Sequence, residues 1–130
     1  MKYWKLSAGF FLLVAILIPV YAWKVDDKVM YQWDAGDGSW WYAAKVTYVN
    51  SNGTFDLTAN GYQQPSSPKK LIKAINWKVG TKLQCQKGRP DPSAKEYLPG
   101  TITTKTGDTI HIKYDSGDEE DTDIIYCRSK

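Results

Sequence analysis

Residues 23–29 read WKVDDKV and residues 77–83 read WKVGTKL, so two segments of the chain open with the same short pattern. Further similar segments follow each opening at an offset of 54 to 56 residues. Self-similarity at a constant period is typical of a duplicated structural unit. The matched pairs are 23–29 with 77–83, 42–46 with 98–102, and 53–57 with 108–112. The repeat predicts two units, which we place at residues 23–75 and 76–130.

The repeated segments have the pattern of short antiparallel strands. Residues 44–49 (AKVTYV) and 109–114 (TIHIKY) alternate loosely between apolar and polar side chains, as half-buried strands do. Gly53 and Gly107 mark tight turns, because glycine adopts positive φ without strain. No segment after residue 22 has a sustained helical period. We therefore expect an all-β fold in which each unit is a five-stranded sheet, curled into a small barrel that closes its edges.

The first 22 residues, MKYWKLSAGFFLLVAILIPVYA, are typical of a secretory signal peptide. Two lysines precede an apolar run over residues 6–20, and Val20 and Ala22 then offer small residues for a cleavage site. A membrane anchor over residues 6–23 is the alternative, although this segment is short and contains a proline. Both interpretations export the two units, which are then secreted, periplasmic or attached to a membrane.

Cys85 and Cys127 are the two cysteines of the chain. An even number of cysteines in an exported small domain favours a disulfide, and two separate buried thiols are the alternative. The repeat places Cys85 on the first strand of the second barrel and Cys127 after its last strand. These strands are neighbours in a closed barrel, so we expect the two Cα atoms to lie roughly 4.4–6.8 Å apart.

Composition and charge limit the classes of function. The 130 residues are 42% hydrophobic and 14% aromatic, and the formal net charge is +3. Without the two lysines of the N-terminal segment, 15 Lys and Arg stand against 14 Asp and Glu, which gives a net charge of +1. That balance provides no basic field for nucleic acid. One His and two Cys are too few for a multi-His or Cys-rich metal site, so we expect neither a metal nor another cofactor. No nucleophile–base or paired-carboxylate pattern indicates an enzyme.

The most specific stretch of the second unit is IKYDSGDEE at residues 112–120, a strand followed by an acidic turn. The first unit has WKVDDK at 23–28, an aromatic residue at Trp33, and an aromatic residue followed by a small-residue strand, YAAKV, at 42–46. In this order the residues resemble the Tudor/Agenet group of SH3-like barrels, and the first unit is similar to the Tudor domain of the survival of motor neuron protein. The resemblance covers nearly all of residues 23–127 and implies two such barrels in tandem.

Members of this group hold methylated Lys or Arg in a cage of aromatic rings, where cation–π attraction contributes about 0.5–2 kcal/mol per contact. The resemblance implies such a cage in the first barrel, with Gln64 as a hydrogen-bonding neighbour of the ligand. Thr58 stands at one expected aromatic position, where Trp41 or its neighbour Trp40 could fill the gap. The rings that the resemblance places directly in the cage are Trp33, Tyr42 and Tyr62.

The second unit departs further from the cage pattern. Lys87 stands where a ring is expected, and Leu98 replaces the aromatic residue of the following strand. The second cation site that the resemblance still allows consists of Tyr97, Tyr114, Asp115 and Asp118.

Other residues are interpreted as structural. Trp23 and Trp77 are expected to pack at the barrel edges, and the lone His111 is expected in packing or at the surface. The expected core residues are Tyr48, Phe55, Ile102, Ile110 and Ile112.

These patterns favour an exported, non-catalytic binding protein. Its ligand is expected to be a peptide or protein, including one with a methylated or other cationic group, and cell-wall material could occupy the same groove of an SH3-like barrel. The first alternative is a structural or accessory domain of a cell-envelope assembly. The second is an intracellular reader of methyl marks, which requires that the N-terminal segment is not a signal peptide. Membrane contact is expected only through an uncleaved N-terminal segment.

Overall fold

The structure is a computed structural model that describes residues 23–130. The predicted signal peptide or anchor, residues 1–22, lies outside the described residues. From residue 23 onward the regular structure consists of antiparallel β-strands and short 3₁₀ turns, which confirms the expected all-β class. Within this range, no helix has the length and apolar character needed to cross a membrane.

The first half of the described chain contains five strands and one 3₁₀ turn. Strand β1 pairs with β2 and with β5, while β3 pairs with β2 and β4. These elements are β1 (Lys28–Asp34), β2 (Ser39–Val49), β3 (Phe55–Ala59), β4 (Tyr62–Ser67), η2 (Lys69–Leu71) and β5 (Ile72–Ala74).

The second half repeats this order of pairing. Strand β6 pairs with β7 and with β10, while β8 pairs with β7 and β9. A 3₁₀ turn again precedes the last strand. The elements are β6 (Lys82–Gln86), β7 (Tyr97–Thr106), β8 (Thr109–Tyr114), β9 (Glu119–Asp123), η3 (Ile124–Tyr126) and β10 (Cys127–Ser129).

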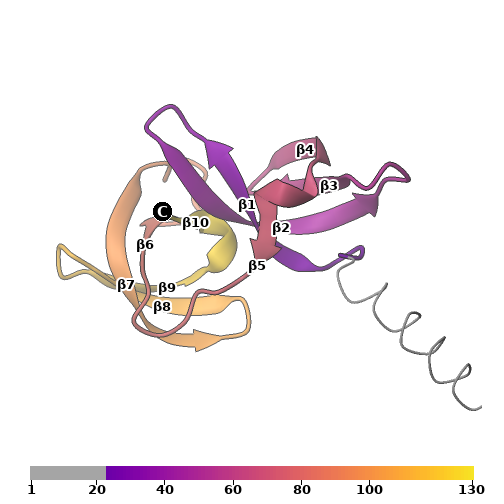
Figure 1. The fold of residues 1–130 in the computed structure, drawn as a ribbon. Coiled ribbons are helices and arrows are strands. Elements are labelled where there is room, and N and C mark those ends of the chain that lie inside the picture. Colours follow the sequence, from indigo (N-terminus) through magenta and orange to yellow (C-terminus); the bar gives the residue numbers. More distant parts are fainter. Residues whose placement is uncertain (1–22) are drawn as a thin grey trace, which may run out of the picture.

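The two halves are joined by the last strand of the chain. Strand β10 pairs with β6 of its own half and also with β2 of the first half, where Arg128 faces Tyr42 and Ser129 faces Trp41. Figure 1 shows the first half (indigo to magenta) beside the second (orange to yellow), with β10 at the junction. One hydrogen-bonded sheet therefore runs through both halves.

The predicted glycine turns are present at both positions of the repeat. Gly53 has a φ of 88° and Gly107 a φ of 61°. A third turn, between β3 and β4, uses Asn60 with a φ of 47° and Gly61 with a φ of 83°. Asn-Gly suits a two-residue hairpin because both positions require positive φ.

Two apolar clusters form the core, and β1 and β2 contribute to both. Val29 and Ala44 pack in the cluster of the first half. Met30 and Ala43, their sequence neighbours, pack in the cluster of the second half. Successive side chains of a strand point to opposite faces of a sheet, so these two strands are covered on both sides. The second cluster therefore depends on residues of the first half.

Four of the five expected core residues are buried, namely Phe55, Ile102, Ile110 and Ile112. The fifth expectation was wrong, because Tyr48 is 60% exposed. The register of β2 against β3 shifts between Val46 and Tyr48, and such a bulge interrupts the alternation of buried and exposed positions.

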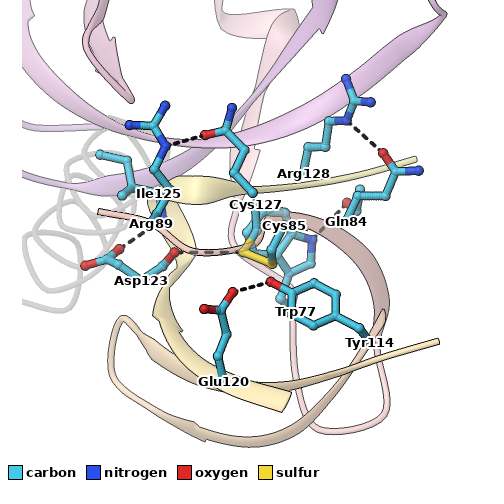
Figure 2. Close-up of a disulfide and its surroundings, with 12 residues drawn as sticks. Trp77, Gln84, Cys85, Arg89, Tyr114, Glu120, Asp123, Ile125, Cys127 and Arg128 are labelled. Carbon is cyan, nitrogen blue, oxygen red and sulfur yellow. Dashed lines mark hydrogen bonds between the residues drawn. A yellow bond between two sulfur atoms is a disulfide. The ribbon is translucent and has the colours of Figure 1, made fainter. Parts of the chain in front are cut away.

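The predicted disulfide between Cys85 and Cys127 is present (Figure 2). The two residues face each other across β6 and β10, as expected for the first and last strands of a closed unit. Their Cα atoms lie 4.0 Å apart, slightly below the expected range. Trp77 is buried in the same cluster, and its Nε1 donates a hydrogen bond of 2.8 Å to Ser129 Oγ.

Candidate functional site

A pocket of about 560 Å³ lies between the two halves. Its size is in the range of pockets that hold small ligands. Strands β1 to β4 line it from the first half, and β6, the loop before β7, β7, η3 and β10 line it from the second. The lining residues are Tyr31, Trp33, Ala35, Tyr42, Ala59, Asn60, Gly61, Tyr62, Gln64, Gln86, Arg89, Lys95, Tyr97, Ile125 and Arg128.

The first half provides most of the aromatic rings of this pocket. Trp33 is 45% exposed and Tyr62 is 70% exposed, so both offer ring surface to a ligand. Tyr31 belongs to the core, but its hydroxyl donates a hydrogen bond of 3.5 Å to Gln64 Oε1 at the pocket. Its ring centroid lies 6.3 Å from that of Trp33. The two rings lie close together because positions 31 and 33 share one face of β1.

The Asn-Gly turn between β3 and β4 fixes one edge of the pocket. Asn60 Nδ2 donates a hydrogen bond of 2.9 Å to Gln86 Oε1 at the end of β6. Gln86 Nε2 in turn donates to the carbonyl of Lys95, at 3.0 Å. These side-chain amides connect the first half to the loop that leads into β7.

Arg128 of β10 is the most enclosed charged residue of the pocket, with 9% of its side chain exposed. Its guanidinium carbon lies 4.1 Å from the ring centroid of Trp40 and 4.1 Å from that of Tyr97. The guanidinium also donates to Tyr42 Oη at 3.2 Å, to Gln84 Oε1 at 3.0 Å and to Asp37 Oδ2 at 3.0 Å. Figure 2 shows the bond to Gln84. An internal cation thus covers rings that could otherwise face a ligand.

The ion pair with Arg128 changes the acidity of Asp37. Partial desolvation raises the pKa of Asp37, but the hydrogen bond and the charge of Arg128 outweigh it, so the pKa of this carboxyl is lowered overall. Asp37 also accepts a hydrogen bond of 3.1 Å from Trp40 Nε1. Asp37, Trp40 and Arg128 therefore form one connected group beneath the pocket.

Arg89 lies at the other side of the pocket, in the loop before β7. Its Nε donates to Gln86 Oε1 and to the carbonyl of Ala94, both at 3.0 Å. Its guanidinium lies 5.3 Å from the ring centroid of Tyr126. Within residues 23–130, neither Arg89 nor Lys95 takes part in an ion pair, and no Asp or Glu lines the pocket.

Four of the five residues predicted for the first cage lie around this pocket, namely Trp33, Tyr42, Tyr62 and Gln64. Trp41 lies elsewhere, because it is adjacent to Tyr42 on β2 and points to the opposite face. It packs on the core of the second half, with Lys73 Nζ 4.1 Å from its ring centroid. Trp40, the other candidate to replace the missing ring, is buried beneath Arg128.

The residues predicted for the second site are not brought together. Tyr97 lines the pocket between the halves, where its ring centroid lies 6.2 Å from that of Tyr42. Tyr114 is buried in the core, where burial and the hydrogen bond to Glu120 raise its pKa. Asp118 forms an ion pair with Lys87, and Asp115 is exposed in the same turn.

His111 lies on the outer face of the second half. Its Nε2 is 2.9 Å from Glu119 Oε1, and its Nδ1 is 2.7 Å from Asp121 Oδ1. The hydrogen bonds to these two carboxylates raise the pKa of His111. The described part of the chain contains no group of three or more His, Cys, Asp or Glu arranged to hold a metal ion.

The pocket residues that sequence reasoning missed include all three of its cations. For Arg128 the sequence did contain a signal, because this residue directly follows Cys127. The disulfide therefore places it on β10, the strand that pairs with β6. Arg89 and Lys95 lie in an irregular loop whose position depends on contacts between the halves, and no sequence pattern marks them.

Comparisons with known proteins add no relative. No protein-family model matches the chain, and neither the curated proteins nor the solved structures contain a similar one.

Proposed function

We propose that the protein is an exported, non-catalytic binding protein whose ligand site is the pocket between its two halves. The observation that carries this proposal is the pocket itself, which has a volume of about 560 Å³. Exposed rings of the first half and cations of the second half line it together. The largest well-formed pocket with a few convergent polar groups is the first place to expect a ligand.

We further propose that the halves are tandem Tudor/SH3-like barrels, residues 23–75 and 76–130. The repeated order of strand pairing supports this, with a 3₁₀ turn before the last strand of each half. The sequence resemblance supports it as well. The sharing of core residues and the pairing of β10 with β2 indicate barrels that are tightly joined.

The chemistry of the lining favours binding over catalysis. Rings, side-chain amides and cations line the pocket, and these groups hold and orient a ligand. General acid–base catalysis most often uses a His or a carboxylate, and neither lines the pocket within residues 23–130. We therefore assign the pocket a recognition role.

Export is supported by the disulfide, because such bonds persist in oxidising compartments. We propose a secreted or periplasmic protein with residues 1–22 cleaved, or membrane attachment through residues 6–23. N-terminal sequencing of the exported protein distinguishes the two: a chain that begins at Trp23 supports cleavage, and an intact N-terminus in the membrane fraction supports the anchor.

A methylated Lys or Arg is a second candidate ligand, favoured by the gathering of Trp33, Tyr42 and Tyr62 around one pocket. The positive charges near the pocket disfavour binding of such a cation. Arg128 already occupies the face of Tyr97, and Arg89 and Lys95 would repel another cation. The charge of the lining thus favours a ligand of another kind.

Titration of the intrinsic tryptophan fluorescence tests the proposed site. The probes are peptides with methylated Lys or Arg, the same peptides without methylation, and oligosaccharides. Tyr62→Ala should weaken binding about fivefold, since one ring contact contributes about 1 kcal/mol. Tyr48→Ala is the matched control, because Tyr48 is another exposed tyrosine of the first half and lies outside the pocket. No response to any probe would contradict the proposal and favour a structural role in an envelope assembly.

A further inference from the structure

The lining of the pocket has a net positive charge. Arg89, Lys95 and Arg128 line it, and no carboxylate does. Arg128 is paired with Asp37, which lies outside the lining. Arg89 and Lys95 have no ion-pair partner among residues 23–130. Two cations facing one concave site attract an anion, because walls of low polarity strengthen the field inside a cleft.

Arg89 has hydrogen-bond donors available for such an anion. Its Nε is bound to Gln86 Oε1 and to the carbonyl of Ala94, which hold the guanidinium in place. Its two terminal nitrogens donate no hydrogen bond within the described part of the chain. The acidic residue of the same loop, Asp91, accepts hydrogen bonds from Ser93 at 3.0 and 2.8 Å. These bonds and the charge of Arg89 lower the pKa of Asp91, but Asp91 and Arg89 form no ion pair. A guanidinium with free terminal N–H groups matches the two oxygens of a carboxylate.

The remaining lining suits a ligand with a ring and hydroxyl groups. Trp33 and Tyr62 present exposed ring faces, against which an apolar ring face can pack. Gln64 accepts a hydrogen bond from Tyr31 through Oε1, while its Nε2 donates none among the described residues. Side-chain amides and phenols can both donate and accept, as hydroxyl groups require.

We propose that the pocket binds an acidic saccharide, with the carboxylate of a hexuronic acid held by Arg89 and Lys95 and the sugar ring packed on Trp33 or Tyr62. This inference rests on the proposed function and names the ligand class of that site. An extended acidic peptide is less well matched. It would be expected to pair with the free edge of β4, where Pro65 cannot donate a hydrogen bond.

Isothermal titration with trigalacturonic acid tests the proposal. The matched control ligand is its fully methyl-esterified form, which keeps the sugar rings but has no charge. We expect binding of the acid only, weakening as salt concentration rises. Equal binding of the ester would overturn the proposal, and so would tighter binding of an oligoglutamate peptide.

Two variants test the assigned cations. Arg89→Gln and Lys95→Gln should each weaken binding about tenfold or more, since a hydrogen bond to a charged group contributes about 1.5–3 kcal/mol. Lys95→Gln is the safer variant, because the Lys95 side chain forms no bond within residues 23–130, whereas Arg89 also holds its loop. Lys105→Gln is the matched control, with the same charge change at an exposed lysine outside the pocket. Unchanged affinity in Lys95→Gln and Arg89→Gln would overturn the assignment.

Different results would contradict the proposal that the pocket is a ligand site and the proposal that its ligand is an acidic saccharide. If a neutral oligosaccharide or a methylated peptide binds and Tyr62→Ala weakens it, the pocket is the ligand site but the acidic-saccharide assignment is wrong. If neither these probes nor trigalacturonic acid bind, both proposals are wrong.

Discussion

The two halves of the molecule share one order of strand pairing but contribute different chemistry to the pocket between them. The first half provides the exposed rings of Trp33 and Tyr62, and none of its charged residues lines the pocket. The second half provides three cations, Arg89, Lys95 and Arg128. A duplicated unit can therefore form a site that neither copy has alone, provided that the copies differ in sequence where they meet.

The halves also differ in how they are held together. The second half is closed by a disulfide between its first and last strands. The first half has no cysteine, but its strands β1 and β2 are covered on both faces, by its own core and by that of the second half. We infer that each half relies on contact with the other, and that the second half is held by a covalent link as well.

Loss of the disulfide should have the largest effect on stability. The bond closes a loop with a sequence separation of 42 residues, for which chain entropy predicts a contribution of about 4 kcal/mol. Urea unfolding of the double variant Cys85→Ala/Cys127→Ala measures the loss. Thiol titration of the denatured, oxidised protein is the control and should find no free thiol. A loss below about 1 kcal/mol, or two titratable thiols, would contradict this account.

Met30→Ala should have the next largest effect, about 3 kcal/mol, because Met30 is fully buried and truncation leaves a cavity. The variant lies in the first half but removes packing from the second, so hydrogen exchange of the amides in β8 should become faster. Val29→Ala is the matched variant, facing the core of the first half. Unchanged protection of β8 in Met30→Ala would mean that the halves are independent.

A smaller effect is expected at Gly100, which corresponds to Ala44 in the repeat. A Cβ at Gly100 would lie 2.8 Å from Ile112 Cδ1 and from the carbonyl oxygen of Lys113. Overpacking of this kind costs about 2 kcal/mol, so Gly100→Ala should lower the free energy of unfolding by that amount. The reverse exchange, Ala44→Gly, should cost about 1 kcal/mol through chain entropy and lost burial. Thermal unfolding of both variants checks that Gly100→Ala is destabilised more than Ala44→Gly. An unchanged stability of Gly100→Ala would contradict this prediction.

The smallest expected effect is the pH dependence of the stability that His111 contributes. Its pKa is raised in the folded state by Glu119 and Asp121, so the stabilisation is fully present below the unfolded pKa of about 6.5 and is lost as pH rises through the folded value. Between the unfolded and the folded pKa of His111, the unfolding midpoint of the wild type should fall as pH rises. In His111→Gln this contribution to the pH dependence should be absent. A wild type and variant with the same pH profile would contradict the assignment.

Much of the strand framework could be predicted from the sequence because its causes are local. Gly53 and Gly107 mark turns through their backbone freedom, and the repeat placed Cys85 and Cys127 on neighbouring strands. Tyr48 was misplaced because a bulge reverses the alternation that its position implied.

The site was predictable only in part. Its rings follow strand positions that the resemblance could transfer, and Trp33, Tyr42 and Tyr62 do line one pocket. Trp41 does not line this pocket, because its face of β2 is covered by the second half. The cations at Arg89 and Arg128 reach the pocket through contacts between the halves, namely the amide of Asn60 and the pairing of β10 with β2. For Arg89 such contacts leave no period or motif in the sequence, whereas the position of Arg128 next to Cys127 is a signal.

The most direct test of a pocket built jointly by both halves is a two-dimensional NMR titration of the ¹⁵N-labelled protein with trigalacturonic acid. We predict that one ligand event shifts the Trp33 indole N–H and the Gln64 side-chain amide of the first half together with the Arg89 Nε–H of the second. All three should follow the same binding curve. Shifts confined to one half, or centred on the acidic turn at Asp115 and Asp118, would contradict the account.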